Sequence, residues 1–268
     1  MQRLQSPPTE PTGGALRGRR VIVTRARTQA HAFVARLQAL GAVPIVIPVI
    51  EIRPPADPGP LDEAARRLAE FDWVVFASVH GVAALLERVR SLAGVRVAAV
   101  GGATAAALEE RGQRVDLVPA ETSAKGLVEA LARVGVTGAR ILLPQAHGGR
   151  AELEEGLTRH GAQVCRVTAY ETVTVPIPAD AARRLALHGA DAVTFTSPST
   201  VHGFVAGLRA HGWSGPWGFP AFCIGPTTAA AARGARFEVA AVPERAESDA
   251  LVDLLVEYFS TGNNERKR

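Results

Sequence analysis

Three segments of this chain recur in the same order about 120 residues apart, and this internal repeat constrains the fold more than any other feature of the sequence. Segment A begins at Arg20-Val21-Ile22-Val23 and again at Arg140-Ile141-Leu142-Leu143. Segment B is Phe71–Ser78 and then Ala190–Ser197, and segment C is Val100–Ala105 and then Ile224–Ala229. The order A-B-C-A-B-C predicts two domains that are built on one plan.

Each segment has the pattern of strands alternating with helices. In the first segment A, Phe33, Leu37 and Leu40 recur at helical spacing, and a β-branched run follows at Val43–Ile50. Segment B reads as a strand and a helix, whereas segment C reads as a strand, a helix, a second strand at Val115–Val118 and a second helix. Five strands that alternate with helices predict an α/β fold in which helices cover both faces of a parallel sheet.

The length of 268 residues suits two domains of ordinary size. An extended stretch that ends in Pro follows each copy of segment A, at Val49–Pro55 and at Ala169–Pro176. Two equivalent linkers indicate that the chain leaves the first domain and later returns to it. We expect a discontinuous first domain, residues 1–50 plus 176–262, a second domain, 54–169, and linkers at 49–55 and 169–177. A simple tandem of two domains is the alternative that the repeat leaves open.

The composition excludes several classes of protein. A hydrophobic fraction of 47% and a net charge of +4 exclude intrinsic disorder, and no apolar run approaches the ~20 residues that span a membrane. We expect a soluble, cytoplasmic protein whose two cysteines, Cys165 and Cys223, pack in the cores. Only Lys125 and Lys267 are lysines, so arginine carries the basic charge. This suits an acidic partner, although a compositional bias is the simpler explanation.

Loops rich in Gly, Ser and Thr follow the predicted strands, and each loop precedes a predicted helix. Ligands of open parallel α/β sheets bind beyond the carboxyl ends of the strands, where the N–H groups of helix starts favour carboxylates or phosphates. The candidate substrate-binding residues in these loops are Thr24, Arg25, Ser78, Gly101, Thr104, Ser123, Gly149, Arg150, Ser197, Pro198, Ser199, Thr227 and Thr228. Taken singly, each Ser or Thr among them is also explained as an ordinary N-cap.

Signatures of the common catalytic classes are missing. The sequence has no GxSxG, HExxH, CxxC or Walker A motif, and its seven histidines show no metal-ligand spacing, so we expect neither a cofactor nor a metal. Tyr170, one of two tyrosines, lies in the second predicted linker. A phenol at this place can donate a proton inside a cleft or serve as a packed hinge residue.

Seven short motifs carry a resemblance to a known family. They are Val21–Arg25, Phe76–Val82, Val100–Ala105, Gly149-Arg150 with Leu153, Val167–Thr172, Phe195–Ser199 and Ile224–Ala229. In this order and spacing, from about Arg19 to Phe259, the chain resembles the uroporphyrinogen-III synthase family. The resemblance implies two flavodoxin-like parallel-sheet domains joined by a two-stranded linker, and no cofactor or metal. The sequence also lacks heptads and clustered basic residues, so we expect a monomer with a small-molecule substrate and no nucleic-acid partner.

The resemblance also implies an activity. The family closes hydroxymethylbilane, a linear tetrapyrrole with eight carboxylates, into uroporphyrinogen III, and it inverts the last pyrrole through a spiro intermediate. Tyr170 matches the family's catalytic tyrosine, and Thr104, Ser197 and Thr228 match positions that face the cleft. Members often carry Asn where His80 stands, and an Arg-Gly pair near Gln145-Ala146. The competing interpretation is a two-lobed protein that binds a small anion without catalysis.

Overall fold

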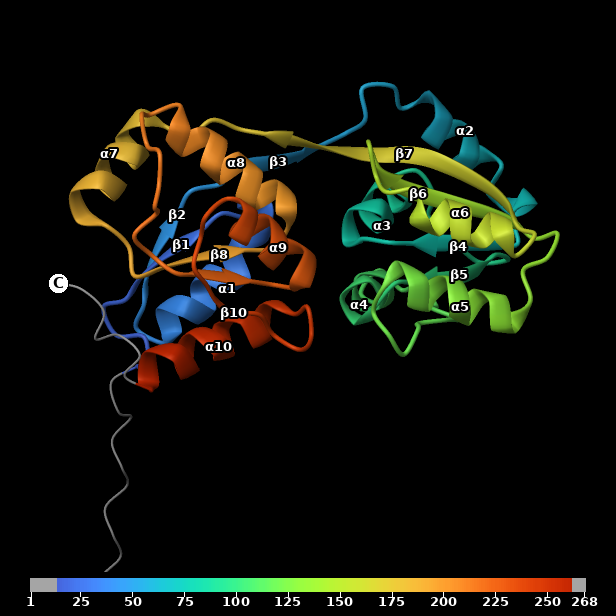
Figure 1. Ribbon diagram of the computed structural model, residues 1–268. Helices are drawn as coiled ribbons and strands as arrows, with labels where there is room; N and C mark the ends of the chain where they lie inside the picture. Colours follow the sequence, from blue (N-terminus) through green and yellow to red (C-terminus); the bar gives the residue numbers. More distant parts are fainter. Residues whose placement is uncertain (1–13, 262–268) are drawn as a thin grey trace, which may run out of the picture. The chain divides into compact units, whose positions relative to one another are not determined.

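The computed structural model describes residues 14–261, and the chain divides into two compact units (Figure 1). Unit 1 consists of Met1–Glu51 and Thr174–Arg268, and unit 2 of Ile52–Val173. Both divisions fall inside the stretches that the sequence marked as linkers. Residues 1–13 and residue 262 of the first predicted domain lie outside the described residues.

Unit 1 contains a five-stranded sheet in the order β10-β9-β8-β1-β2, and its neighbouring strands are parallel. The strands are β1 (Arg20–Val23), β2 (Val43–Val46), β8 (Ala192–Phe195), β9 (Ala221–Cys223) and β10 (Val239–Ala241). The helices are α1 (Arg27–Ala39), α7 (Ala179–His188), α8 (Pro198–Arg209), α9 (Pro226–Gly234) and α10 (Ser248–Ser260). Gly41 ends the α1 segment with a φ of 84°, a value that glycine adopts without strain.

The core of unit 1 lies on both faces of its sheet. On one face Val21 and Val23 of β1 pack with Phe33 of α1 and Leu255 of α10. On the opposite face Phe195 of β8 meets Phe204 of α8 edge-on, with ring centroids 5.8 Å apart. Because helices cover both faces, the strands read as continuous apolar runs, as buried parallel strands do.

Unit 2 contains the second sheet, in the order β3-β7-β6-β4-β5, and its β7-β6-β4-β5 part is parallel. The strands are β3 (Ile50–Arg53), β4 (Trp73–Phe76), β5 (Arg96–Ala99), β6 (Arg140–Ala146) and β7 (Gln163–Thr174). The α-helices are α2 (Gly59–Arg66), α3 (Val79–Leu86), α4 (Gly102–Glu109), α5 (Ala124–Val134) and α6 (Glu152–Arg159), and a 3-10 turn spans Leu68–Glu70.

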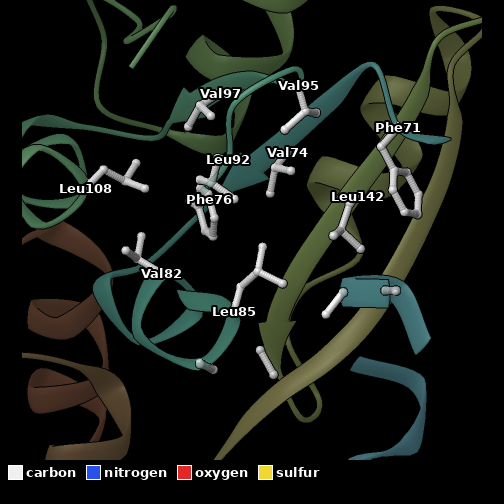
Figure 2. Packing of buried hydrophobic residues seen from close by; sticks show 14 of the residues in the cluster. Phe71, Val74, Phe76, Val82, Leu85, Leu92, Val95, Val97, Leu108 and Leu142 are labelled. Carbon is white, nitrogen blue, oxygen red and sulfur yellow. The ribbon is translucent and has the colours of Figure 1, made fainter. Parts of the chain in front are cut away.

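Alternation along β4 separates the two cores of unit 2. Val74 and Phe76 point to the face covered by α2, α3 and α4, where Figure 2 shows Phe76, Val82, Leu85 and Leu108 directed toward one another. Trp73 and Val75 point to the face covered by α5 and α6. Because successive side chains of β4 point to opposite faces of the sheet, the strand contributes to two separate cores, each covered by its own helices.

The topology decides which repeat segments share a unit. Unit 1 joins β1 and β2, from the first segment A, with β8, β9 and β10 from the second B and C. Unit 2 joins β4 and β5, from the first B and C, with β6 and β7 from the second A. In unit 1 this gives the flavodoxin-like order 2-1-3-4-5. The predicted α/β fold is confirmed, with two mostly parallel sheets, and each sheet combines strands from both halves of the repeat.

Two local expectations differ from the structure. The strand predicted at Val115–Val118 is reduced to one parallel bridge between Leu117 and Ala98. Cys223 is buried as expected, but the prediction that Cys165 packs in a core is wrong, since it is exposed. Cys165 lies near the start of β7, where it lines an open cavity of about 480 Å³ together with residues of α2.

Candidate functional site

The candidate site residues lie at the carboxyl edge of each sheet, because the parallel strands end there and a helix starts after them. The switch in strand order lies between β1 and β8 in unit 1 and between β6 and β4 in unit 2. Ligands of open α/β sheets bind outside the sheet at such a switch.

Tyr170, Ser78 and His80 form a cluster at this edge of unit 2. Tyr170 pairs with Ala146, the last residue of β6, and therefore lies in β7 within unit 2 rather than in the predicted linker. The phenol O–H donates a 3.0 Å hydrogen bond to Oγ of Ser78. The ring centroids of His80 and Tyr170 are 5.1 Å apart. Since Oγ of Ser78 also accepts the N–H of Gly81 at 3.1 Å, the hydroxyl hydrogen of Ser78 can be donated to a ligand.

Close packing holds this cluster in place. Ser78 is the N-cap of α3, and a Cβ at Gly81 in the first turn would lie 2.8 Å from the carbonyl oxygen of Pro144 in β6. Only glycine lets α3 approach β6 so closely. The Tyr170 ring packs against the cluster shown in Figure 2, which includes Phe76 and Val82 on either side of Ser78.

Burial keeps both titratable groups of the cluster neutral. It raises the pKa of the Tyr170 phenol above its ordinary value, and the hydrogen bond to Ser78 opposes this only in part. Burial lowers the pKa of the neighbouring His80 below 6.5. At neutral pH the cluster therefore presents a protonated phenol, which has a proton to donate, and an uncharged imidazole.

The other candidate residues of unit 2 surround helix starts. Gly101 precedes α4, and a Cβ there would meet the Thr122 side chain at 2.5 Å. Thr104 is buried in the first turn of α4, and its hydroxyl forms no hydrogen bond with a described residue. Ser123 caps α5 by accepting the N–H of Gly126 at 2.9 Å. In the loop before α6, the Gly149 carbonyl accepts a 2.6 Å bond from Arg166, whereas Arg150 is exposed.

Unit 1 places a second set of candidate residues at its own carboxyl edge. Ser197 and Thr200 form a capping box at the start of α8, with Pro198 at the first helical positions. Ser199 and Thr227 are exposed near the starts of α8 and α9, while Thr228 is buried. Arg25 is also buried, and burial lowers the pKa of its guanidinium to about 10.

Thr24, which was predicted to bind substrate, forms a hydrogen bond inside the sheet of unit 1. Its side chain is fully buried, and its hydroxyl donates to the Thr194 carbonyl at 2.7 Å. The Thr194 hydroxyl donates in turn to the Ile22 carbonyl at 2.9 Å. These bonds cross-link β1 and β8, so the Thr24 hydroxyl is used within the sheet.

Three residues at these edges were missing from the predicted set. His80 contacts Tyr170, Ser248 accepts hydrogen bonds from Arg25, and Gln145 is the next-to-last residue of β6, with its Oε1 buried and without a partner among residues 14–261. The available signal for Gln145 was a polar residue at the end of an apolar strand. Ser248 ends a loop of the same kind as those of the predicted residues, but its contact with Arg25 could not be read from the sequence, because Arg25 lies near the other end of the chain.

No group of three or more His, Cys, Asp or Glu side chains among the described residues is arranged to hold a metal ion. In the same part of the chain, no helix combines the length and the apolar character needed to cross a membrane.

Comparison with known proteins places the chain in a family. The uroporphyrinogen-III synthase HemD family matches residues 31–253. A uroporphyrinogen-III synthase from Synechococcus elongatus is 38% identical over 195 residues, which cover 70% of this chain and 74% of that protein. The chloroplastic uroporphyrinogen-III synthase of Oryza sativa subsp. japonica is 30% identical over 221 residues, which cover 80% and 72%.

Solved structures share the fold. A mutant uroporphyrinogen III synthase from the extremely thermophilic bacterium Thermus thermophilus superposes with a TM-score of 0.63 at 21% identity, over 91% of this chain and 100% of that one. The Helicobacter pylori enzyme has a TM-score of 0.59 at 17% identity, over 89% and 99%. The family match covers most of the chain, and the cyanobacterial and plant synthases are 38% and 30% identical to it. The chain therefore belongs to the uroporphyrinogen-III synthase family, the lyases that cyclise hydroxymethylbilane in tetrapyrrole biosynthesis.

Proposed function

We propose that this enzyme converts hydroxymethylbilane into uroporphyrinogen III by a spiro intermediate that inverts the terminal pyrrole, and that Tyr170 assists the departure of the substrate hydroxyl. The observation that supports this assignment is the hydrogen-bonded pair of Tyr170 and Ser78 at the carboxyl edge of unit 2. The pair offers a neutral proton donor and a second hydroxyl that can pass the proton on.

The reaction requires the protein to bind and fold the substrate and to donate one proton. A proton from the Tyr170–Ser78 pair reaches the hydroxyl oxygen, the C–O bond breaks, and water leaves while a pyrrole nitrogen lone pair stabilises the electrophilic carbon. The terminal pyrrole attacks this carbon through its substituted position, and the spiro ring then fragments and recloses with that pyrrole inverted. Loss of a ring proton at the end returns the proton that was donated. Correct folding of the chain supplies the rest of the catalysis, because it sets which pyrrole carbon attacks.

The loops at the two carboxyl edges are proposed to bind the carboxylates of the substrate. In unit 2 these are the helix starts at Gly101, Thr104, Ser123 and the Gly149-Arg150 loop. In unit 1 they are the starts of α8 and α9, with Ser197, Pro198, Ser199, Thr227 and Thr228. Helix-start N–H groups bind carboxylates without requiring a particular side chain, which fits the use of several of these hydroxyls as caps.

We extend the proposal to a monomeric, cytoplasmic enzyme. Both cysteines are free, as a reducing compartment would keep them. Light scattering behind size exclusion should give the 28.2 kDa of one chain. A mass of twice that value would overturn the monomer, and recovery of the native protein from the periplasm would overturn the location.

An isomer assay tests the activity. Freshly generated hydroxymethylbilane is supplied to the purified protein, and the product is oxidised and separated into its isomers. Type III isomer above the spontaneous type I background is the expected result. Type I alone at every protein concentration would overturn the synthase and would favour a protein that binds an anion without catalysis.

A further inference from the structure

Arg25 is a buried cation without an anionic partner. It follows β1 at the carboxyl edge of unit 1, its exposed fraction is 8%, and it forms no ion pair with any residue from 14 to 261. Burial depresses the pKa of the guanidinium only to about 10, so the charge persists at neutral pH. A charge taken out of water without a counter-charge is strongly unfavourable, so its retention calls for an anion from outside the chain.

The contacts of Arg25 leave part of its binding capacity unused. Its two terminal nitrogens each lie 3.2 Å from Oγ of Ser248, and one lies 3.5 Å from the carbonyl oxygen of Gln29. The guanidinium rests on the Phe33 ring, 4.4 Å from its centroid. A guanidinium has five N–H donors, so the Nε–H and one further N–H have no partner in the described part of the chain. Because Ser248 accepts from Arg25, its own hydrogen is also available to an incoming acceptor.

Two helix starts add positive potential beside Arg25. Helix α1 begins at Arg27 with no side-chain cap and no acidic residue in its first turn. Helix α10 begins at Ser248, and its N-cap residue, the exposed Glu247, makes no side-chain cap bond. The nearby acid in α10, Asp249, is paired with Arg36. Uncapped helix starts favour anions and disfavour cations, so the described surroundings of Arg25 increase the need for a negative partner.

We propose that Arg25, Ser248 and the first N–H groups of α1 bind one carboxylate of the linear tetrapyrrole, with Arg25 and Ser248 holding it directly. This inference rests on the proposed function. A carboxylate accepts from the free N–H groups of Arg25 and the hydroxyl of Ser248, and it supplies the missing negative charge. The alternative is that Arg25 is a clamp that only ties the start of α10 to α1.

The two roles are separated by measuring binding and stability in the same variants. Uroporphyrin III, the oxidised octacarboxylate product, is titrated into the wild type, Arg25→Gln, Arg25→Lys and Ser248→Ala, and urea midpoints are measured without ligand. The control is Arg209→Gln, which removes the same charge from an exposed position in the last turn of α8. We expect Arg25→Gln to weaken binding by about tenfold to a hundredfold, the range of one charge-assisted contact, with an unchanged or raised urea midpoint. Arg25→Lys and Ser248→Ala should each weaken binding less, and Arg209→Gln should bind like the wild type.

Other results would overturn the site. Equal dissociation constants for the wild type and Arg25→Gln contradict it, and so does a lowered urea midpoint with unchanged binding, which indicates the clamp. If Arg25→Gln does not fold, Arg25→Lys and Ser248→Ala decide, and unchanged binding in both rejects the proposal. The isomer assay on the wild type distinguishes the failures: type I product alone rejects the proposed function, whereas type III product from an Arg25→Gln enzyme with unchanged KM rejects only this site.

Discussion

At the scale of single residues, Tyr170 and Ser78 derive their properties from their neighbours. The phenol is held against an apolar cluster and hydrogen-bonded to a helix N-cap, so burial rather than a nearby charge sets its protonation. A group that is neutral and oriented can give up a proton when charge develops on a leaving oxygen. Burial also explains why His80, whose ring lies next to that of Tyr170, is not a cation at neutral pH.

Tyr170→Phe tests the proton donor directly. The variant keeps the ring in its packing and removes only the O–H, so we expect kcat for type III isomer to fall about 10²-fold, the lower range of general acid catalysis. The control is Tyr258→Phe, at the only other tyrosine, which packs edge-on against Phe222 in unit 1. Turnover close to wild type in Tyr170→Phe would leave binding geometry as the source of catalysis.

The pH dependence of kcat/KM follows from the same two groups. Burial raises the pKa of Tyr170 and so keeps the phenol protonated through the neutral range, and burial lowers the pKa of His80 and so keeps the imidazole uncharged at neutral pH. We therefore expect a plateau of kcat/KM across neutral pH, with the alkaline limb above the ordinary pKa of tyrosine and the acid limb below the ordinary pKa of histidine. The rate of type III formation, corrected for spontaneous closure at each pH, gives the profile. A descending limb near pH 8 would show that another group supplies the proton.

At the scale of secondary-structure elements, several helices that start at the carboxyl edges are capped by the side chain of their own N-cap residue. Ser78, Ser123 and Ser197 each accept an N–H from the first turn of the helix that follows. The sequence left both a capping role and a substrate-binding role open for them, and the structure assigns the hydroxyl oxygen to the cap. A capped serine can still donate its hydrogen, so the two uses are compatible at Ser78.

Glycines near these helix starts differ in how closely the backbone approaches them. A Cβ at Gly126 in α5 would lie 2.3 Å from the carbonyl oxygen of Glu121, whereas a Cβ at Gly102 in α4 meets nothing within 4 Å. We expect Gly126→Ala to lower the free energy of unfolding by about 1–3 kcal/mol, because the backbone must shift. Gly102→Ala, the control, should change it by less than about 0.5 kcal/mol. Urea unfolding measures both, and equal effects would contradict the steric explanation.

At the scale of the whole molecule, the permuted arrangement of segments makes unit 2 an insertion in unit 1. The chain leaves unit 1 after β2 and re-enters it after β7, and the N–H of Val175 donates to the carbonyl of Val49 at 3.0 Å. The two ends of the insertion are therefore adjacent. Each unit has hydrophobic clusters of its own, in the sheet and helices that belong to it.

We expect each unit to fold without the other. Residues 50–174 alone should unfold cooperatively in urea, as reported by the fluorescence of Trp73, the only tryptophan of that fragment. Unit 1 with residues 50–174 replaced by two glycines should do the same, because the cut ends already meet. Neither fragment should form type III isomer, since each keeps only one set of carboxyl-edge loops. A fragment without a cooperative transition would contradict the independence of its core.

The sequence predicts the local parts of this molecule well. The helix that carries Phe33 and Leu37 and the strand and helix of segment B follow from spacing and residue type, because they depend on neighbours a few residues away. Its failures occur where distant segments decide the outcome. Cys165 has a strand pattern, but the exposed or buried state of a strand residue depends on which helix covers it.

What the sequence by itself determines is the plan: six repeat segments, strands alternating with helices, and loops rich in Gly, Ser and Thr at the carboxyl ends of the strands. The tertiary structure alone decides that the first segment A pairs with the second B and C, that Tyr170 meets Ser78, and that Arg25 meets Ser248 across 223 positions of chain. The physical reason is the range of the interactions. Periodicity records which face of an element is apolar, whereas the pairing of equally apolar parallel strands depends on the crossovers and burial that the whole chain can satisfy at once.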